Sequence, residues 1–338
     1  MRQVVFESAE RIVLRDVTPP EPRAGEVLIR SHAVGICGSD LHALHGSHPW
    51  IDLPVVPGHE VSGTVEAVGA ETAEWAVGDR VLLEPNLICG ECARCRSGRY
   101  NLCERLQVVG CQTVGAMADL FIAPGHRLHR VPEGMTMTDA ALVEPLSTAT
   151  HAVRVSGDLA CATVVVLGAG SIGLLTALAA RSAGARQVAI TDPIAGKRNR
   201  AVALGAADLA LDPLEPGVVE RLRSELGDRP DVVLDCVANQ ASTDQAVALA
   251  VKGGTVTVVG VPTSRVSLDL ATVQDAEIRI QGTAMYVVED VLRAIELLQQ
   301  GAIRGADVVT GHFALEQVED ALTAARSGDH VKVQLDLL

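Results

Sequence analysis

The chain has 338 residues, and its 28 Lys and Arg against 42 Asp and Glu give a formal net charge of −14 at pH 7. This length suits two domains with hydrophobic cores, and the acidic balance without a basic block argues against nucleic acid as a partner. No run approaches the ~18 apolar residues of a membrane span. The polar start of the chain lacks a signal-peptide pattern. We therefore expect a cytoplasmic protein in a reducing compartment, with no membrane partner.

The first part of the chain, up to about residue 140, predicts an antiparallel, barrel-like β domain. Short β-type runs at 27–31, 60–68 and 79–83 are separated by Gly and Pro. Two motifs of this part, GICGSDLH at 35–42 and PGHE at 57–60, supply a thiolate, an imidazole and carboxylates. Such a mixed set leaves a zinc position open, which is typical of a catalytic metal.

Four cysteines then occur in one short segment, Cys89, Cys92, Cys95 and Cys103. Four thiolates from one loop match a closed, tetrahedral structural zinc site that orders a loop without its own core. The alternative is a pair of disulfides, which a reducing compartment disfavours. The segment therefore predicts structural zinc.

The middle of the chain changes to alternating strands and helices. Apolar strands are expected at 164–167, 187–191, 232–235 and 255–259, with alanine-rich helices at 174–183 and 196–204 between them. This alternation predicts a doubly wound parallel sheet. A helix at 288–300, a second at 315–326 and a strand at 331–335 follow, and we expect them to complete the first domain. The predicted domains are 1–150 with 286–338, and 151–285.

A glycine-rich turn, Gly168-Ala-Gly170-Ser-Ile-Gly173, follows the first of these strands and opens a helix. Asp192 stands at the end of the next strand, 19 residues after Gly173. This context matches a dinucleotide fingerprint, in which the diphosphate faces a helix N-terminus. Asp192 would accept hydrogen bonds from the ribose and repel a 2′-phosphate, which favours NAD, and Lys197 could reach the same ribose. The alternative is a glycine turn of another α/β fold.

Taken together, these motifs resemble the zinc-dependent medium-chain alcohol and polyol dehydrogenases, and the similarity runs nearly end to end. The motifs GICGSDLH, PGHE, CGECARC…NLC, LVEPLSTATHAV, GAGSIG and VVGVP carry it. The resemblance points to the branch of sorbitol, butanediol and threonine dehydrogenases. It implies an α/β protein with a GroES-like β-barrel catalytic domain and a Rossmann coenzyme domain, assembled as a homodimer or homotetramer.

The resemblance also implies a catalytic zinc site, which makes two zinc ions per subunit. Cys37 and His59 look like two ligands, and Glu144 stands where liver-type alcohol dehydrogenases have a third ligating cysteine. Glu60 is an equal candidate for the third ligand, or a carboxylate behind the ligands. Asp40 suits a hydrogen bond to the free N–H of His59, which would fix its tautomer.

The reaction implied is NAD-dependent oxidation of a CH–OH donor to a ketone. Zinc would polarise the substrate hydroxyl, a hydride would pass to nicotinamide, and Ser39 and His42 would relay the proton to solvent. The resemblance places Ile172 at the coenzyme, and two backbone segments at the nicotinamide: Val259, Gly260, Val261, and Thr283, Ala284, Met285.

Four residues are predicted to approach the substrate: Ala43, Trp50, Met117 and Tyr286. Met285 replaces an arginine of sorbitol dehydrogenases, and Ala43 replaces a tyrosine, so extended polyols are not the expected substrates.

The sequence leaves open two other functions: a zinc-independent NADPH quinone or enone reductase, and an inactive nucleotide-binding protein. Of the remaining cysteines, Cys161 and Cys236 are predicted to be small core residues, and Cys111 is unassigned.

Overall fold

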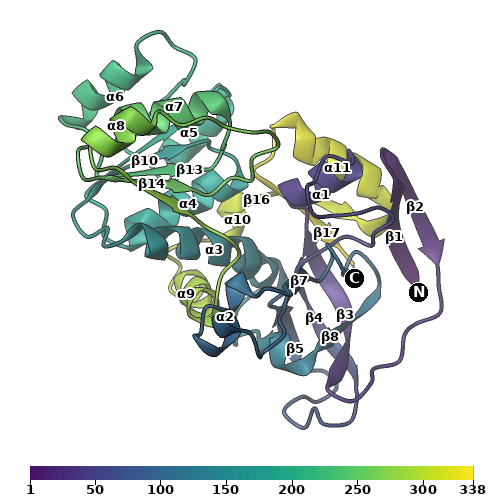
Figure 1. Cartoon of the computed structure of the whole chain (residues 1–338). Coiled ribbons are helices and arrows are strands. Elements are labelled where there is room, and N and C mark those ends of the chain that lie inside the picture. The colour runs from purple at the N-terminus through teal and green to yellow at the C-terminus, as the bar shows by residue number, and fades with distance from the viewer. Residues whose placement is uncertain (338) are drawn as a thin grey trace. The chain divides into compact units, whose positions relative to one another are not determined.

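The computed structural model describes residues 1–337 and divides into two compact units. The first unit contains Met1–Glu144 and the described part of Val287–Leu338, and the second contains Pro145–Tyr286. Segments from both ends of the chain therefore share one unit (Figure 1). Among residues 1–337, no helix is both long enough and apolar enough to span a membrane.

The described part of the first unit is built on a seven-stranded sheet with the order β16-β17-β3-β4-β5-β9, in which β8 also pairs with β3. Two small two-stranded sheets, β1-β2 and β6-β7, accompany it. The strands are β1 (Arg2–Ser8), β2 (Arg11–Asp16), β3 (Glu26–Gly35), β4 (Glu60–Val68), β5 (Arg80–Leu83), β6 (Asn86–Leu87), β7 (Gln107–Val108), β8 (Leu120–Pro124), β9 (Leu128–Arg130), β16 (Val309–Ala314) and β17 (Lys332–Asp336).

The described part of the first unit also contains helices. They are α1 (Gly38–Leu44), α2 (Ala93–Arg96), η1 (Tyr100–Leu102), η2 (Gly125–Arg127), α9 (Val288–Gln299), α10 (Gly305–Val308), η3 (Leu315–Gln317) and α11 (Val318–Ser327). Helix α11 packs on β16 and β17, and its Val318, Ala321 and Leu322 are buried because they recur at helical spacing on one face. Strands β3 and β17 are antiparallel neighbours that pair Gly35 with Gln334, so strand β17 lies beside the predicted metal motif.

The second unit is a six-stranded parallel sheet with the order β12-β11-β10-β13-β14-β15. Its strands are β10 (Thr163–Leu167), β11 (Gln187–Thr191), β12 (Leu209–Leu211), β13 (Val232–Asp235), β14 (Thr255–Val258) and β15 (Arg279–Gly282). The central strand β10 is buried at every residue, as expected for a parallel sheet covered on both faces. The predicted barrel-like and doubly wound sheets are both confirmed.

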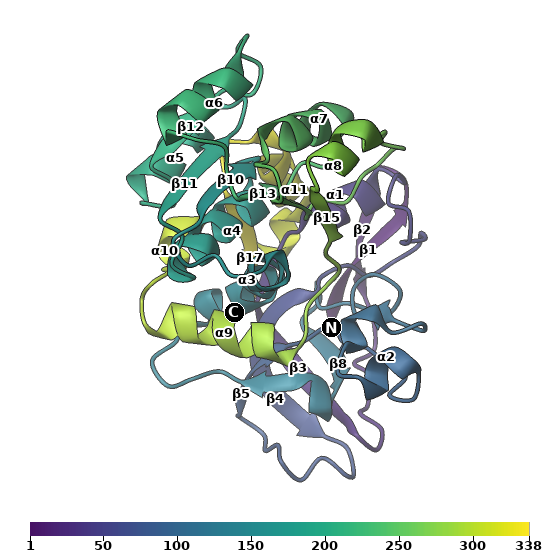
Figure 2. The same cartoon turned by 60° about the vertical axis from the view of Figure 1, so that its left-hand side comes forward.

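Helices alternate with these strands: α4 (Ser171–Ser182), α5 (Ala195–Ala203), α6 (Val218–Leu226), α7 (Gln240–Leu249) and α8 (Leu270–Asp275) (Figure 2). The long helix α3 (Met137–Ser156) crosses the boundary between the units. Leu167 at the end of β10 is in register with Thr191 and with Asp235. The carboxyl ends of three parallel strands therefore meet at one edge.

The two cysteines that were predicted to be small core residues have different surroundings. Cys236 is partly exposed, although burial of its thiol group raises the pKa of that thiol to about 12. The prediction for Cys161 is wrong, because this residue is exposed and has φ +62 in the turn before β10. A cysteine next to an apolar strand looks the same in the sequence whether it continues the strand or makes the turn that begins it.

Candidate functional site

The four cysteines of the 89–103 segment converge on one point. Their sulfur atoms lie within 4.8 Å of one another, with Cys89 3.8 Å from Cys95, Cys92 3.5 Å from Cys95, and Cys103 3.5 Å from Cys89. A disulfide requires sulfurs about 2.05 Å apart, so these cysteines are not paired. Zn–S bonds of about 2.3 Å in a tetrahedron place sulfurs about 3.8 Å apart. The four sulfurs therefore fit a zinc ion.

Backbone N–H groups point at these sulfurs. The N–H of Cys92 donates to Cys89 Sγ at 3.3 Å, and the N–H of Cys89 donates to Cys103 Sγ at 3.3 Å. The N–H groups of Glu91 and Cys92 are the main reason that the pKa of Cys89 falls to about 6. At Cys89 the loop therefore favours thiolate, which is the form that binds a metal, whereas burial raises the pKa of Cys95 to about 12.

The cysteine loop is tied to the sheet by a buried ionic cluster that the sequence did not reveal. Glu84 accepts from Arg127 Nη1 at 2.9 Å and approaches His129 Nε2 at 3.1 Å. Tyr100, from the loop, also hydrogen bonds Glu84, and its ring lies 5.1 Å from the Arg127 guanidinium. Burial opposes ionisation of Glu84, but His129 and Arg127 outweigh it and hold the pKa of Glu84 below its usual value. The cluster joins residues from three separate segments.

A second convergence involves Cys37, His59 and Glu60, whose ligand atoms lie within 4.8 Å of one another. Cys37 caps α1 just after β3 ends, and His59 and Glu60 stand where β4 begins. Strands β3 and β4 pair Gly35 with Glu60. An added Cβ at Gly35 would overlap the Glu60 carboxylate, so the glycine makes room for it. Within residues 1–337, this group and the four cysteines are the two clusters that could hold a metal ion.

The environment of His59 suits a cation. Only 5% of the residue is exposed, and its Nδ1 lies 3.9 Å from Asp40 Oδ1, beyond hydrogen-bond distance. Neither atom has a hydrogen-bond partner in the described part of the chain. Burial lowers the pKa of His59, but Cys111, Asp40 and Cys37 outweigh it and raise that pKa well above its usual value. Asp40 lies beside His59, but the hydrogen bond predicted between them is not formed; the other oxygen of Asp40 accepts from the Cys37 N–H at 2.8 Å.

Lys332 is a site residue that the sequence analysis missed. Its ammonium group contacts the carboxylate of Glu60 and donates to the carbonyl of Ile36 at 2.9 Å. Glu60 is fully buried, and Lys332 is 2% exposed. Burial lowers the pKa of Lys332, but Glu60 and Cys37 outweigh it, with a further contribution from Glu144, and raise that pKa. The sequence signal that could have identified this residue was a lysine inside the strand expected at 331–335.

The other predicted catalytic residues lie on two helices. Glu144 lies on α3 and is 7% exposed. It is not part of the cluster of Cys37, His59 and Glu60, but its charge contributes to the raised pKa of Lys332. Ser39 and His42 lie on α1 and are partly exposed.

The glycine turn of the second unit has the backbone that a dinucleotide loop needs. Gly168 has φ +92, and Gly170 caps α4, which also contains Ile172. A Cβ at Gly173 would overlap the carbonyl of Gly168, so only glycine allows this helix to pack so closely. No heavy atom lies within 4 Å of a Cβ built on Gly170, which leaves space beside the helix N-terminus.

Asp192 follows β11 at the same edge of the sheet. One of its oxygens accepts from the N–H of Ala169 at 2.9 Å and the other from the N–H of Ile194 at 2.8 Å. An ionised carboxylate has about four acceptor positions, so both oxygens can still accept from other groups. Lys197 is partly exposed on α5, whereas Arg198 donates to the Asp192 carbonyl at 2.6 Å.

The segments predicted to meet nicotinamide follow the carboxyl ends of β14 and β15. They are Val259, Gly260 and Val261, and Thr283, Ala284 and Met285. Met285 has φ +49, a conformation uncommon for a residue with a side chain.

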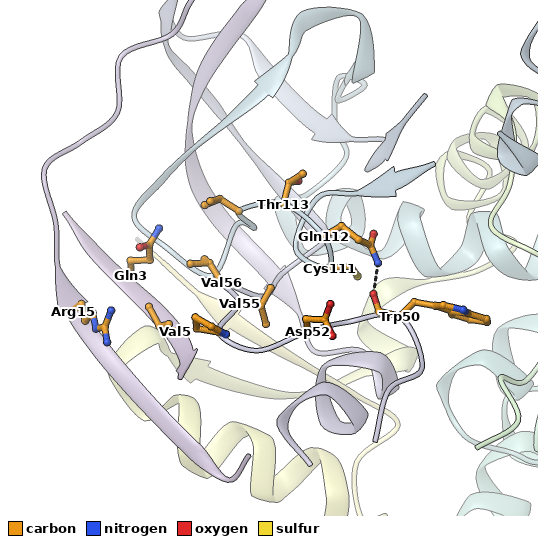
Figure 3. Close-up of a pocket in the computed structure, with 12 residues that line it drawn as sticks. Gln3, Val5, Arg15, Trp50, Asp52, Val55, Val56, Cys111, Gln112 and Thr113 are labelled. Carbon is orange, nitrogen blue, oxygen red and sulfur yellow. Dashed lines mark hydrogen bonds between the residues drawn. The ribbon is translucent and has the colours of Figure 1, made fainter. Parts of the chain in front are cut away.

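The four predicted substrate residues have different surroundings. Ala43 and Met117 are part of the hydrophobic core of the first unit, and Tyr286 is fully buried. Trp50 is 67% exposed and lines a pocket of about 520 Å³ together with Arg15, Asp52 and Cys111 (Figure 3). The carbonyl of Trp50 accepts from Gln112 Nε2 at 2.8 Å, which joins two of the segments that line this pocket.

Comparisons with known proteins identify the family. Residues 23–133 match the alcohol dehydrogenase GroES-like domain, and residues 171–300 match the zinc-binding dehydrogenase domain. This chain belongs to the zinc-binding dehydrogenases. The resemblance stated from the sequence is therefore confirmed.

Its relatives include polyol and diol dehydrogenases. A sorbitol dehydrogenase of Bombyx mori is 33% identical over 97% of this chain and 96% of its own length. A zinc-binding dehydrogenase of Sinorhizobium meliloti 1021, solved bound to NADP, is 33% identical with a TM-score of 0.93, covering 99% of this chain and 98% of that one. The 2R,3R-butanediol dehydrogenase of Bacillus subtilis is 26% identical with a TM-score of 0.92, over 100% and 99% of the two chains.

Proposed function

We propose that this zinc-binding dehydrogenase oxidises a secondary alcohol to a ketone, reversibly, with NAD as hydride acceptor. The observation that carries the proposal is the convergence of Cys37, His59 and Glu60 in a domain of the alcohol dehydrogenase type. Thiolate, imidazole and carboxylate are suitable zinc ligands, and three protein ligands leave a position for substrate. The two metal-ligand groups argue against the zinc-independent quinone or enone reductase.

Zinc, when bound, supplies Lewis acidity toward the substrate hydroxyl. The protein holds the ligands in place: Asp40 anchors the turn at Cys37 and faces the Nδ1 of His59. Ser39 and His42, on the first turns of α1, are proposed to carry the hydroxyl proton toward solvent. Glu60 and Glu144 remain the two candidates for a further oxygen ligand.

A second zinc ion is proposed at the four cysteines, where the sulfur spacing supports tetrahedral coordination. It would order the loop that bears Tyr100. We propose that the enzyme is a homodimer or homotetramer.

The proposed coenzyme is NAD. Asp192 places a carboxylate after the second parallel strand, where it would accept from ribose hydroxyls and repel a 2′-phosphate. The relative solved with NADP makes this preference worth a direct test. The loops at Gly260 and Ala284 would meet the nicotinamide.

The proposed substrate carries one polar group beside the reacting carbinol, as in a vicinal diol, an acyloin or a cyclic sugar-like alcohol. Met285 and Ala43 provide no hydrogen bond to a chain of hydroxyls, and each unsatisfied hydroxyl would cost about 1–3 kcal/mol. Met117 is flexible and apolar.

A substrate panel tests this assignment. NAD reduction is measured with 2,3-butanediol, cyclic polyols, sorbitol and threonine, before and after chelation. We expect activity with a diol or cyclic alcohol that disappears when the metal is removed. Sorbitol with the highest kcat/KM would contradict the proposed pocket, and no chelator-sensitive activity with any alcohol would contradict the proposed reaction.

A further inference from the structure

Lys332 is a buried lysine of β17, and its charge faces the proposed catalytic metal site. The residue is 2% exposed. Its ammonium group contacts both carboxylate oxygens of the fully buried Glu60 and donates to the carbonyl of Ile36 at 2.9 Å. Ile36 directly precedes the proposed ligand Cys37. Glu60 directly follows the proposed ligand His59, so the lysine joins both halves of the site.

Strand pairing fixes the lysine at this place. Gln334 of β17 is in register with Gly35 of β3, and Gly35 is in register with Glu60 of β4. The N–H of Ile36 donates to the carbonyl of Val333 at 3.0 Å, which holds β17 against the turn that follows β3. An added Cβ at Gly35 would overlap the Glu60 carboxylate. The carboxylate therefore occupies a position that three neighbouring strands define.

The carboxylate of Glu60 is shared between the lysine and the proposed ligands. One of its oxygens lies within 4.8 Å of the ligand atoms of Cys37 and His59. The ammonium of Lys332 hydrogen bonds Oε1, whereas Oε2 is buried and accepts no hydrogen bond within residues 1–337. A carboxylate accepts from several partners, so Glu60 can also offer an oxygen to a metal ion. That ion would lie close to the buried ammonium, and like charges repel each other strongly away from water.

We propose that Lys332 is a positioning residue that competes with the catalytic metal ion for the carboxylate of Glu60. The inference rests on the proposed catalytic metal site. While the ammonium holds the carboxylate, Glu60 is drawn away from the metal and leaves a coordination position for the substrate oxygen. Without the lysine, the buried carboxylate would lose its compensating charge, and a bound metal ion would replace that charge. Lys332 therefore makes Glu60 a ligand that can be released, in contrast to Cys37 and His59.

Metal affinity tests this role without measuring activity. The zinc-loaded, full-length protein is equilibrated with increasing concentrations of a chelator, and the release step that is missing in Cys37→Ser identifies the catalytic site. Lys332→Met should lower the Kd of that step by about tenfold or more, because the unpaired Glu60 carboxylate favours the metal-bound state. Lys332→Arg keeps the positive charge and should have a Kd close to that of the wild-type protein. A lysine that only supported the fold would instead weaken zinc binding when it is removed.

Glu60→Gln provides the matched control. An amide lacks the negative charge for which the lysine and the metal ion compete. Lys332→Met should therefore strengthen zinc binding much less in a Glu60→Gln protein than in the wild-type protein. An equal gain in both backgrounds would overturn the competition, because repulsion between the ammonium and the metal ion would then account for it without Glu60.

The outcomes separate the two proposals. A Kd that is unchanged or higher in Lys332→Met would overturn the role of Lys332 and leave the metal site intact. A wild-type protein without a release step that depends on Cys37 would overturn the metal site itself.

A second variant keeps the test available if Lys332→Met does not fold. Lys332→Gln lacks the charge but retains an N–H donor for the carbonyl of Ile36. It should also lower the Kd of the catalytic step, and an unchanged or higher Kd would overturn the inference.

Discussion

Replacing Arg127 with methionine should remove much of the stability of the first unit. Arg127 and Glu84 form an ion pair at 2.9 Å whose side chains are 8% and 3% exposed. Arg127→Met would leave the Glu84 carboxylate buried, with His129 and Tyr100 as its remaining partners. Removing one partner of a buried pair typically costs about 3–5 kcal/mol, because the remaining charge loses its compensation.

An exposed ion pair provides the matched control. Arg30 and Glu66 lie 2.8 Å apart with side chains that are 46% and 40% exposed. Such a pair contributes about 0–1 kcal/mol, so Arg30→Met should change stability little. Adding Glu84→Gln to Arg127→Met removes the uncompensated charge and should recover part of the loss.

Tryptophan fluorescence during urea unfolding measures this effect. The two tryptophans, Trp50 and Trp75, both belong to the first unit, so their emission reports on that unit. We expect Arg127→Met to lower the free energy of unfolding by about 3–5 kcal/mol in the zinc-loaded protein. A loss no larger than that of Arg30→Met would refute the role assigned to the Glu84 cluster.

Three further predictions follow from the same structure. The ionised Glu84 should stabilise the folded protein fully above the ordinary glutamate pKa of about 4.3, and this stabilisation should disappear as pH falls through the lower pKa of Glu84 in the folded state. Urea titrations at several pH values measure it, and a Glu84→Gln variant that is as sensitive to acid as the wild-type protein would count against it. Cys95→Ala should release about one zinc ion per chain and lower the thermal midpoint before any specific loss of chemistry, and metal analysis showing unchanged zinc would exclude a four-cysteine site. In steady-state assays, Asp192→Ser should raise KM for NAD by about tenfold or more and reduce the difference between the KM values for NAD and NADP. A wild-type protein that prefers NADP would reverse the coenzyme assignment.

Local signals in the sequence predicted most of the fold. Residues close together in the sequence form the patterns that were recognised: the apolar strands of the second unit, its glycine turn and the spacing of the four cysteines. Strand β12 was missed because three residues give little periodicity, and strand β15 was missed because Arg279–Gly282 is a polar, partly exposed segment without an apolar run.

Long-range contacts account for what the sequence could not give. Lys332 contacts Glu60 across 272 positions of the chain, and Gly110 packs on the backbone of Gly58. No pattern of spacing encodes such pairs, since they depend on which strands become neighbours in the sheet. The four predicted substrate residues illustrate the same limit, because exposure of a side chain such as Trp50 and burial of Met117 are set by tertiary packing.

Metal content and NAD reduction, measured together in wild-type protein and Cys37→Ser, test the central proposal most directly. The wild-type chain should hold about two zinc ions and reduce NAD with a secondary alcohol, while Cys37→Ser should keep about one zinc ion and its fold but lose turnover. A Cys37→Ser protein that retains wild-type zinc content and substantial turnover would contradict the proposal.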